Sequence, residues 1–98
     1  MQPTWRVIVE FMGPFEFEFG TSTTAVTLPP SATVATLLEA LGARWPAAQR
    51  LRVSLSGGPP QRYCLVSLDY AMLAPEGVLD APLHDGARVC FGAPMVGG

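Results

Sequence analysis

The sequence predicts an α+β domain in which one main helix packs on one face of a mixed sheet of four to five strands. Three observations lead to this class. Runs rich in β-branched and aromatic residues stand near both ends, one amphipathic helical stripe lies between them, and turn signals separate these segments. With 98 residues, the chain has the length of one domain.

The first strand is predicted over 4–11, a run of β-branched and aromatic residues. Val7, Val9 and Phe11 would share one face of it, because side chains alternate between the two faces of a strand. The last strand is predicted over 87–91. Both strands are strongly apolar, so we expect them to be the two central strands of the sheet.

A second strand is predicted over 15–19, where Phe and Glu alternate strictly after the break at Gly13-Pro14. Such alternation is typical of a strand with one buried face. Turn residues at 20–23 come next, and 25–28 returns to extended structure. The pattern therefore predicts a hairpin in this part of the chain.

One helix is predicted to start at Thr33, a favourable N-cap residue, and to end at Pro46. Its apolar positions follow helical spacing and form one stripe. This stripe is interpreted as core that closes one face of the sheet: Val34, Leu37, Leu38, Leu41 and Trp45.

The second half of the chain alternates loops and short strands. The run 51–61 is interpreted as a surface loop, because it contains two glycines followed by two prolines. A strand is predicted over 63–68, turn-like structure over 69–77, and a tight turn at Asp85-Gly86 before the last strand.

Composition and charge argue against nucleic-acid and membrane partners. The formal net charge is −2, with six basic and eight acidic residues, and the basic residues are scattered. No stretch approaches the roughly 20 apolar residues that span a bilayer. The first residues lack the basic and apolar regions of a signal peptide. We therefore expect a cytoplasmic chain that binds neither nucleic acid nor membrane.

All six basic residues are arginine, and the chain contains no lysine. One explanation is a genome that favours arginine codons. Another is that an activated carbonyl handled by this chain has no side-chain amine of its own to attack. Only the α-amino group would then remain as an internal nucleophile of this kind.

The usual catalytic constellations are missing from the sequence. The one histidine, His84, stands beside a turn, Ser67 has no nucleophile elbow around it, and Gly57-Gly58 lacks the lysine of a phosphate loop. We expect neither an autonomous enzyme nor a bound metal or cofactor. Cys64 and Cys90 are predicted to be buried free thiols. A disulfide between them would require neighbouring strands, which the sequence leaves open.

The end of the sequence is its most informative part. No residue after Arg88 is charged. Residues 1–91 are predicted to form the single domain, and 92–98 a flexible tail that brings a bare carboxylate to a second enzyme. Glycine has no side chain, so its backbone can enter a narrow channel. A frayed terminus without function is the alternative. The candidate site residues are Pro94, Met95, Val96, Gly97 and Gly98.

This ending resembles that of the ubiquitin-like sulfur carriers. They include the small subunit of molybdopterin synthase, the thiamine-pathway carrier and the carrier of the thiocarboxylate route to cysteine. Their pattern is proline, leucine, any residue, Asp-Gly, a strand, prolines and a terminal Gly-Gly. Here 82–86 read Pro-Leu-His-Asp-Gly, and the chain ends with Gly97-Gly98. The family fold is the ubiquitin-like β-grasp, which agrees with the predicted order of elements.

The resemblance implies that catalysis belongs to partner proteins. An E1-like adenylyltransferase and sulfurtransferase would consume ATP to adenylate the Gly98 carboxyl, and sulfur would displace AMP to leave a thiocarboxylate. The tail would then enter a sulfur-acceptor synthase, with Gly97 keeping the channel passable and Pro94, Met95 and Val96 positioning the tail. The domain would dock through an exposed apolar patch of the sheet. Molybdenum cofactor, cysteine, thiamine and other thiolated metabolites stay open as products.

Two other functions stay open. A ubiquitin-like protein modifier would be joined through Gly98 to lysines of target proteins, and a chain without lysine cannot link to itself through side chains. A plain β-grasp interaction module would explain everything except the ending. Deletion of Gly97-Gly98 separates them, because only the module would still act.

Overall fold

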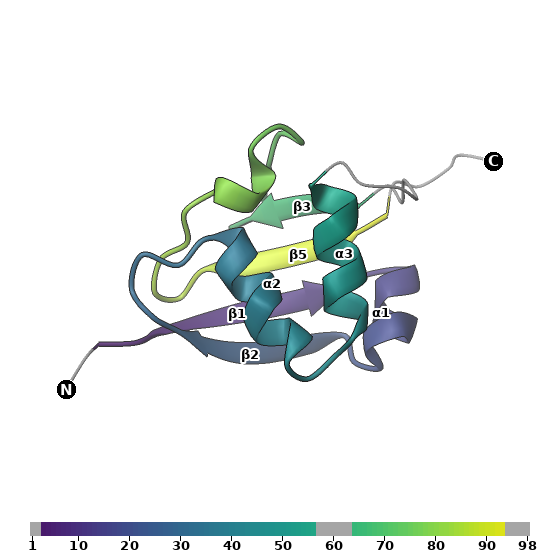
Figure 1. Ribbon diagram of the computed structural model, residues 1–98, viewed down its shortest axis with the longest axis horizontal. Helices are drawn as coiled ribbons and strands as arrows, with labels where there is room; N and C mark the ends of the chain where they lie inside the picture. The colour runs from purple at the N-terminus through teal and green to yellow at the C-terminus, as the bar shows by residue number, and fades with distance from the viewer. Residues whose placement is uncertain (1–2, 57–63, 94–98) are drawn as a thin grey trace.

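The computed structural model describes residues 3–56 and 64–93 of the chain (Figure 1). Within these residues, one mixed sheet has the strand order β2-β1-β5-β3-β4. β1 and β5 are parallel, and the other neighbouring strands are antiparallel. The strands are β1 (Trp5–Phe11), β2 (Thr23–Leu28), β3 (Leu65–Leu68), β4 (Ala71–Met72) and β5 (Arg88–Gly92).

The two apolar strands from opposite ends of the chain lie side by side in the interior of the sheet, as predicted. Val7, Val9 and Phe11 of β1 are at most 2% exposed, and so are Val89 and Phe91 of β5. Their alternation with more exposed neighbours gives the sheet one buried face and one open face.

Two helices cover the buried face, where one was predicted (Figure 1). α2 (Val34–Gly42) begins at Thr33, as expected. The Thr33 hydroxyl accepts a hydrogen bond from the Thr36 amide at 3.4 Å, and the Thr36 hydroxyl accepts one from the Thr33 amide at 3.1 Å. This reciprocal cap satisfies two amides at the start of the helix. Trp45 lies beyond the end of α2 and packs, partly buried, against the core.

The second helix, α3 (Ala47–Leu55), corrects the loop prediction for residues 51–55. Alanine, glutamine, arginine and leucine are good helix formers, and the segment buries Ala47, Ala48 and Leu51. The proline and glycine signals that suggested a loop belong to the next part of the chain. Most of that part lies in 57–63, outside the described residues.

Residues 15–19, predicted as a strand, form part of a helix instead. α1 (Pro14–Phe19) begins with proline, whose missing amide is harmless there. It ends at Gly20, which has a left-handed φ of 71° and donates to the Glu16 carbonyl at 2.9 Å. The strand that pairs with β2 is therefore β1, across the inserted helix α1.

Burial of two phenylalanines decides this outcome. Helical spacing places Phe15 and Phe19 on one side, where both are buried. The Phe19 ring stacks on Phe11 with centroids 4.1 Å apart and lies 5.9 Å from the Trp45 ring. An alternation over five residues is too short to separate a strand from one and a half helical turns.

The connection from β3 to β5 contains one short strand, β4, and one turn of 3-10 helix, η1 (Val78–Asp80). The predicted turn-like stretch is correct except for β4, which pairs with β3 across a turn at Asp69-Tyr70. The tight turn at Asp85-Gly86 is confirmed. Gly86 has a φ of 83°, and the Ala87 amide donates to the His84 carbonyl at 3.1 Å.

Candidate functional site

The predicted site residues Pro94, Met95, Val96, Gly97 and Gly98 lie outside the described residues. The structure does describe the strand that leads to them. β5 is hydrogen-bonded to β1 on one side and to β3 on the other, so its position in the sheet is set by both neighbours. Its last residue is Gly92.

Exposed apolar side chains flank this end of β5 on both sides. Leu65 lies opposite Gly92 on β3 and is 40% exposed. On the β1 side, the Met12 amide donates to the Phe91 carbonyl at 2.9 Å, and the Met12 side chain is 57% exposed. A Cβ built on Gly92 would lie 3.7 Å from the Met12 Cβ. The chain therefore leaves the sheet between two apolar side chains that face solvent.

The open face consists of the strand residues that point away from the helices. Register and burial pattern identify them. Its central members are Arg6, Ile8, Glu10, Leu65, Ser67, Met72, Arg88 and Cys90. It combines the apolar side chains of Ile8, Leu65 and Met72 with the charged side chains of Arg6, Glu10 and Arg88.

One ion pair occupies the middle of the open face. Arg88 Nη1 lies 2.7 Å from Glu10 Oε1, and both side chains are about one third to one half exposed. The Arg88 guanidinium also lies 5.8 Å from the centre of the Tyr70 ring, within reach of a cation–π interaction. Arg88 is therefore positioned between an acid from β1 and an aromatic ring from the β3–β4 turn.

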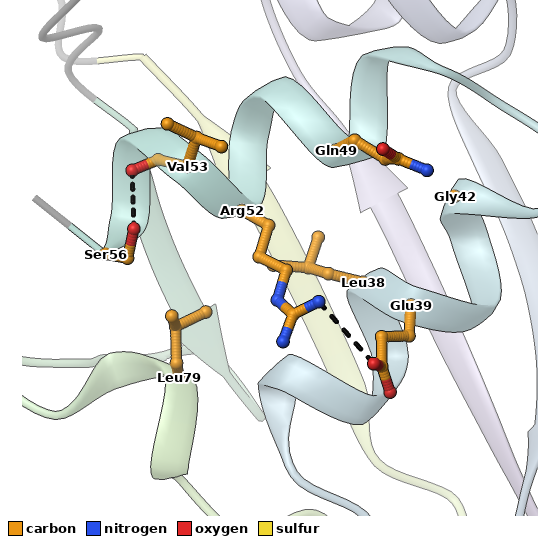
Figure 2. A pocket seen from close by; sticks show the side chains of 8 residues that line it. All are labelled: Leu38, Glu39, Gly42, Gln49, Arg52, Val53, Ser56 and Leu79. Atoms are coloured by element: carbon orange, nitrogen blue, oxygen red, sulfur yellow. Dashed lines mark hydrogen bonds and ion pairs between the residues drawn. The ribbon is translucent and has the colours of Figure 1, made fainter. Parts of the chain in front are cut away.

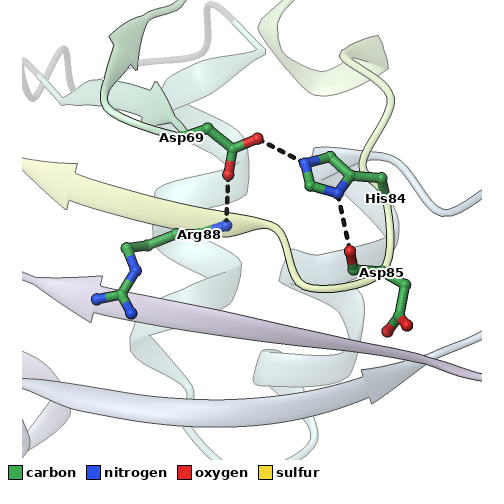
Figure 3. A network of polar contacts seen from close by, with 4 residues as sticks. All are labelled: Asp69, His84, Asp85 and Arg88. Carbon is green, nitrogen blue, oxygen red and sulfur yellow. Dashed lines mark hydrogen bonds and ion pairs between the residues drawn. The ribbon is translucent and has the colours of Figure 1, made fainter.

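A network of polar contacts borders the opposite end of β5 (Figure 3). Asp69 Oδ1 accepts a hydrogen bond from the Arg88 amide at 3.0 Å, and Asp69 Oδ2 lies 2.5 Å from His84 Nε2. His84 Nδ1 lies 2.9 Å from the Asp85 carbonyl oxygen. Asp85 Oδ1 in turn accepts from the Arg6 amide at 2.8 Å. The sequence analysis places His84 beside a turn and assigns it no partner, because no local signal pairs it with an acid 15 positions away.

The two side chains of this network shift each other's titration. The hydrogen bond to Asp69 raises the pKa of His84, and the hydrogen bond from His84 lowers the pKa of Asp69. Both groups are exposed to solvent, which screens the attraction between them. The attraction between His84 and Asp69 is therefore weak, and the contact matters mainly for where it holds the two side chains.

The two cysteines are free, although their regions of the chain are neighbours. Cys90 lies opposite Ser67 on the open face, whereas Cys64 precedes β3 and packs against the core. Both are half-buried rather than fully buried. Burial raises the pKa of the Cys64 thiol to about 12, so this thiol is almost entirely protonated at neutral pH.

Two grooves of the described structure have linings without a pair of side chains suited to acid–base or nucleophilic catalysis. Figure 2 shows one of about 680 Å³ between α2 and α3, where Arg52 Nη1 lies 3.5 Å from Glu39 Oε1. A second groove of about 790 Å³ is lined mainly by apolar side chains of α3, β3 and the β3–β5 connection. In residues 3–56 and 64–93, no cluster of histidine, cysteine or acidic side chains could hold a metal ion. The described part of the chain also has no helix that could span a membrane.

The sequence matches no protein-family model and no curated protein. Solved structures do resemble it. SAMP1 from Haloferax volcanii is 22% identical with a TM-score of 0.72, over 95% of this chain and 99% of that one. Urm1 from Trypanosoma brucei is 22% identical with a TM-score of 0.67, over 100% of both chains.

A third similar structure comes from Pyrococcus furiosus and is named as a molybdopterin converting factor, subunit 1. It is 17% identical, with a TM-score of 0.69 over 93% of this chain and 99% of that one. At this level of identity the likeness concerns the fold. The chain has the ubiquitin-like β-grasp fold, with a mixed sheet and helices packed on one face, and the resemblance inferred from its ending is confirmed at that level.

Proposed function

We propose that this protein is a sulfur carrier whose Gly98 carboxyl is adenylated by an E1-like enzyme and converted to a thiocarboxylate. The thiocarboxylate donates its sulfur in a biosynthetic pathway, inside an acceptor synthase. The chain itself is not the enzyme. ATP is consumed by the activating partner, and the acceptor supplies the groups that handle the small-molecule product.

The end of β5 is the observation that carries this proposal. The strand is held on both sides and delivers the chain to the rim of the open face, between Met12 and Leu65. The remaining sequence is short, uncharged and ends with Gly97-Gly98. A tail that starts at a fixed point beside an exposed apolar surface lets one docking event position a distant carboxyl group.

The chemistry is dictated by the low reactivity of a carboxylate. An oxygen of Gly98 attacks the α-phosphorus of ATP, pyrophosphate leaves, and a mixed anhydride with AMP results. A hydrosulfide then attacks the acyl carbon, and AMP leaves with the electrons of the broken C–O bond. When the sulfur comes from a persulfide of the partner, an acyl disulfide forms first. A second thiolate of the partner then attacks the partner's sulfur in this bond, so that the two partner cysteines form a disulfide and the thiocarboxylate is released. A nucleophilic thiocarboxylate remains at Gly98 in either case.

The tail residues are proposed to act by shape. Glycine at Gly97 and Gly98 leaves room for the walls of a narrow channel to approach the backbone. Pro94, Met95 and Val96 provide apolar surface that a channel can grip. The open face, with Met72 and Leu65 exposed beside the Arg88–Glu10 pair, is proposed as the surface against which the partner docks.

A second candidate is a protein modifier linked through Gly98 to lysines of other proteins. Two observations favour it. The chain has no lysine, so it cannot be joined to itself through a side chain. SAMP1 from Haloferax volcanii also appears among the similar structures under the name small archaeal modifier protein 1. Both candidates share the activation step and differ in the nucleophile of the next step.

The deciding experiment is the intact mass of the chain, purified from its own host and again after incubation with ATP, an E1-like partner and sulfide. A gain equal to replacing one oxygen by sulfur, mapped to Gly98, supports the carrier. Adducts with lysines of other proteins and an unchanged free carboxylate support the modifier. If no E1-like partner of the host yields either the thiocarboxylate or the lysine adducts, both the carrier and the modifier proposals are overturned.

Paired variants separate the tail from the fold. Deletion of Gly97-Gly98 is expected to abolish the mass change. Arg50→Gln, at an exposed position of α3 in the helical layer, is expected to leave it intact. Retention of the mass change after the deletion would mean that the activity does not depend on the Gly97-Gly98 ending, and its loss in Arg50→Gln would mean that the assay responds to changes in the folded domain.

A further inference from the structure

His84 is held by two oxygens that can only accept hydrogen bonds. Its Nε2 lies 2.5 Å from a carboxylate oxygen of Asp69, and its Nδ1 lies 2.9 Å from the carbonyl oxygen of Asp85. A neutral imidazole has one N–H and one lone pair, whereas the imidazolium has two N–H groups. Only the protonated ring satisfies both contacts, because the neutral ring turns a lone pair towards one of the oxygens.

The acid that His84 holds belongs to a strained turn. Asp69 and Tyr70 have φ values of 51° and 69°, in the left-handed region that residues other than glycine rarely adopt. Cross-strand contacts keep Asp69 there. Its amide donates to the Arg88 carbonyl at 2.8 Å, and its Oδ1 accepts from the Arg88 amide at 3.0 Å. The contact with His84 fixes the remaining carboxylate oxygen (Figure 3).

The turn borders the open face. Tyr70, the second residue of the turn, is 77% exposed, and its ring lies near the Arg88 guanidinium at the centre of that face. β4 and the exposed Met72 come directly after it. A change in the turn therefore changes one corner of the surface: Tyr70, Met72 and the surroundings of Arg88.

We propose that His84 and Asp69 form a proton-dependent clasp that fixes the Asp69–Tyr70 turn, and with it this corner of the open face. Protonated His84 closes the clasp. Loss of the proton opens it and loosens the turn. The effect on the free chain is independent of the proposed function, whereas its consequence for partner docking rests on that function.

The charges around His84 set the direction of the effect. Asp69 faces it from the β3–β4 turn and Asp85 from its own turn, and both favour the protonated ring. The Arg88 guanidinium points to Glu10 instead. Because the pKa of His84 is raised, the clasp is complete below the ordinary histidine value of about 6.5 and is lost as pH rises through the raised value. The lowered pKa of Asp69 keeps that acid ionised throughout this range.

The test on the free chain combines an NMR titration of the His84 ring with hydrogen exchange of the Asp69 and Arg88 amides. Exchange is expressed as protection relative to the intrinsic rate at each pH. Protection is expected to fall about two- to fivefold as His84 deprotonates, the range for an exposed pair. His84 titrating at or below its ordinary pKa, or flat protection across its titration, would overturn the clasp.

Asp69→Asn is the most direct test, because the aspartate and asparagine side chains have nearly the same shape. The introduced side chain still offers an oxygen to the Arg88 amide, and its NH₂ group can donate to the lone pair of neutral His84. The pKa of His84 is expected to fall, and protection of the Arg88 amide is expected to lose its pH dependence. Glu76→Gln, an exposed acid in the β4–η1 connection, is the matched control and should change neither. Persistence of the wild-type pH dependence in Asp69→Asn would contradict the proposal.

The docking consequence is measured separately, as affinity for the E1-like partner on both sides of the His84 titration. Wild-type affinity is expected to fall with deprotonation, and that of Asp69→Asn to change less. The same fall in both would contradict a role of the clasp in docking. Absence of binding at every pH would count against the proposed function, while the NMR and exchange results would still decide the clasp.

Discussion

Three phenylalanines in α1 show how burial separates residues of the same type. Phe15 and Phe19 are at most 3% exposed, and Phe19 stacks on Phe11 of β1. Phe11 in turn lies 6.2 Å from the Phe91 ring of β5, centroid to centroid. These rings connect α1 to the two central strands. Phe17, on the other side of the helix, is 89% exposed and contributes little to the core.

Substitution of these residues provides the first prediction. Phe19→Ala is expected to lower the free energy of unfolding by about 3–5 kcal/mol, because it removes a buried ring and leaves a cavity. Phe17→Ala is expected to change it by about 0.5 kcal/mol or less. Urea denaturation measures both. Comparable losses would contradict the helix, because a strand would place both rings on one face.

The local histidine chemistry belongs to the same scale. His84 and Asp69 are each half-exposed, so their attraction contributes little to global stability. Their value lies in geometry, since two acceptor oxygens select one protonation state of the ring. The local clasp can therefore respond to pH without unfolding the domain.

At the scale of elements, the helices differ in how their ends are formed. α2 begins with a complete reciprocal cap between Thr33 and Thr36. α3 begins at Ala47, and Pro46 at its N-cap position provides no side-chain hydrogen bond to the helix. α2 also buries a full apolar stripe, so its position against the sheet depends on where it starts.

The N-cap of α2 gives the second prediction. Thr33→Ala is expected to destabilise the protein by about 1 kcal/mol, because the Thr36 amide loses its acceptor and the cap becomes one-sided. Thr33→Ser keeps the hydroxyl and is expected to retain most of the stability. Thermal or urea unfolding compares the three proteins. Equal stability of the alanine and serine variants would show that the hydroxyl is not the stabilising group.

At the scale of the whole molecule, the sheet has two different faces. One is covered by α2 and α3, as Figure 1 shows, and its side chains belong to the hydrophobic core. The other combines exposed Leu65 and Met72 with the central Arg88–Glu10 pair. β5 ends at the rim of this open face. A docked partner could therefore bind the surface and receive the tail together.

The third prediction tests the open face directly. Met72→Asp is expected to weaken binding to the proposed E1-like partner by about tenfold or more, because it buries a charge in an apolar contact. Val53→Asp is the matched control, an exposed apolar residue on α3 in the helical layer. It is expected to leave affinity unchanged. Titration calorimetry of both variants measures the difference. An equal loss, or a loss confined to Val53→Asp, would place docking elsewhere.

Much of the fold could be predicted because its signals are local. The alternation in β1, the cap at Thr33 and the turn at Asp85-Gly86 each depend on residues within a few positions of one another. α1 was missed because, over five residues, the alternation of Phe and Glu fits the two-residue period of a strand as well as the burial of Phe15 and Phe19 on one side of a helix. α3 was missed because the loop signals after Ser56 were extended backwards into it.

The candidate site also has a part that local sequence predicts and a part that depends on the tertiary structure. Gly97 and Gly98 are predicted from the sequence, through the ending and its distance from the Asp-Gly turn, and they lie outside the described residues. The surface around the root of the tail could not be named. Met12 and Leu65 become neighbours of Gly92 only through the order of the strands.

By itself the sequence determined the class of fold, the central strands and the main helix, because periodicity, capping and turn chemistry act over short distances along the chain. The functional tail stays a prediction of the sequence. Only the tertiary structure decided which distant residues meet. Arg88 reaches Glu10 across 78 positions, and His84 reaches Asp69 across 15. The physical reason is that strand order and register place these side chains together, and both depend on how the whole core packs.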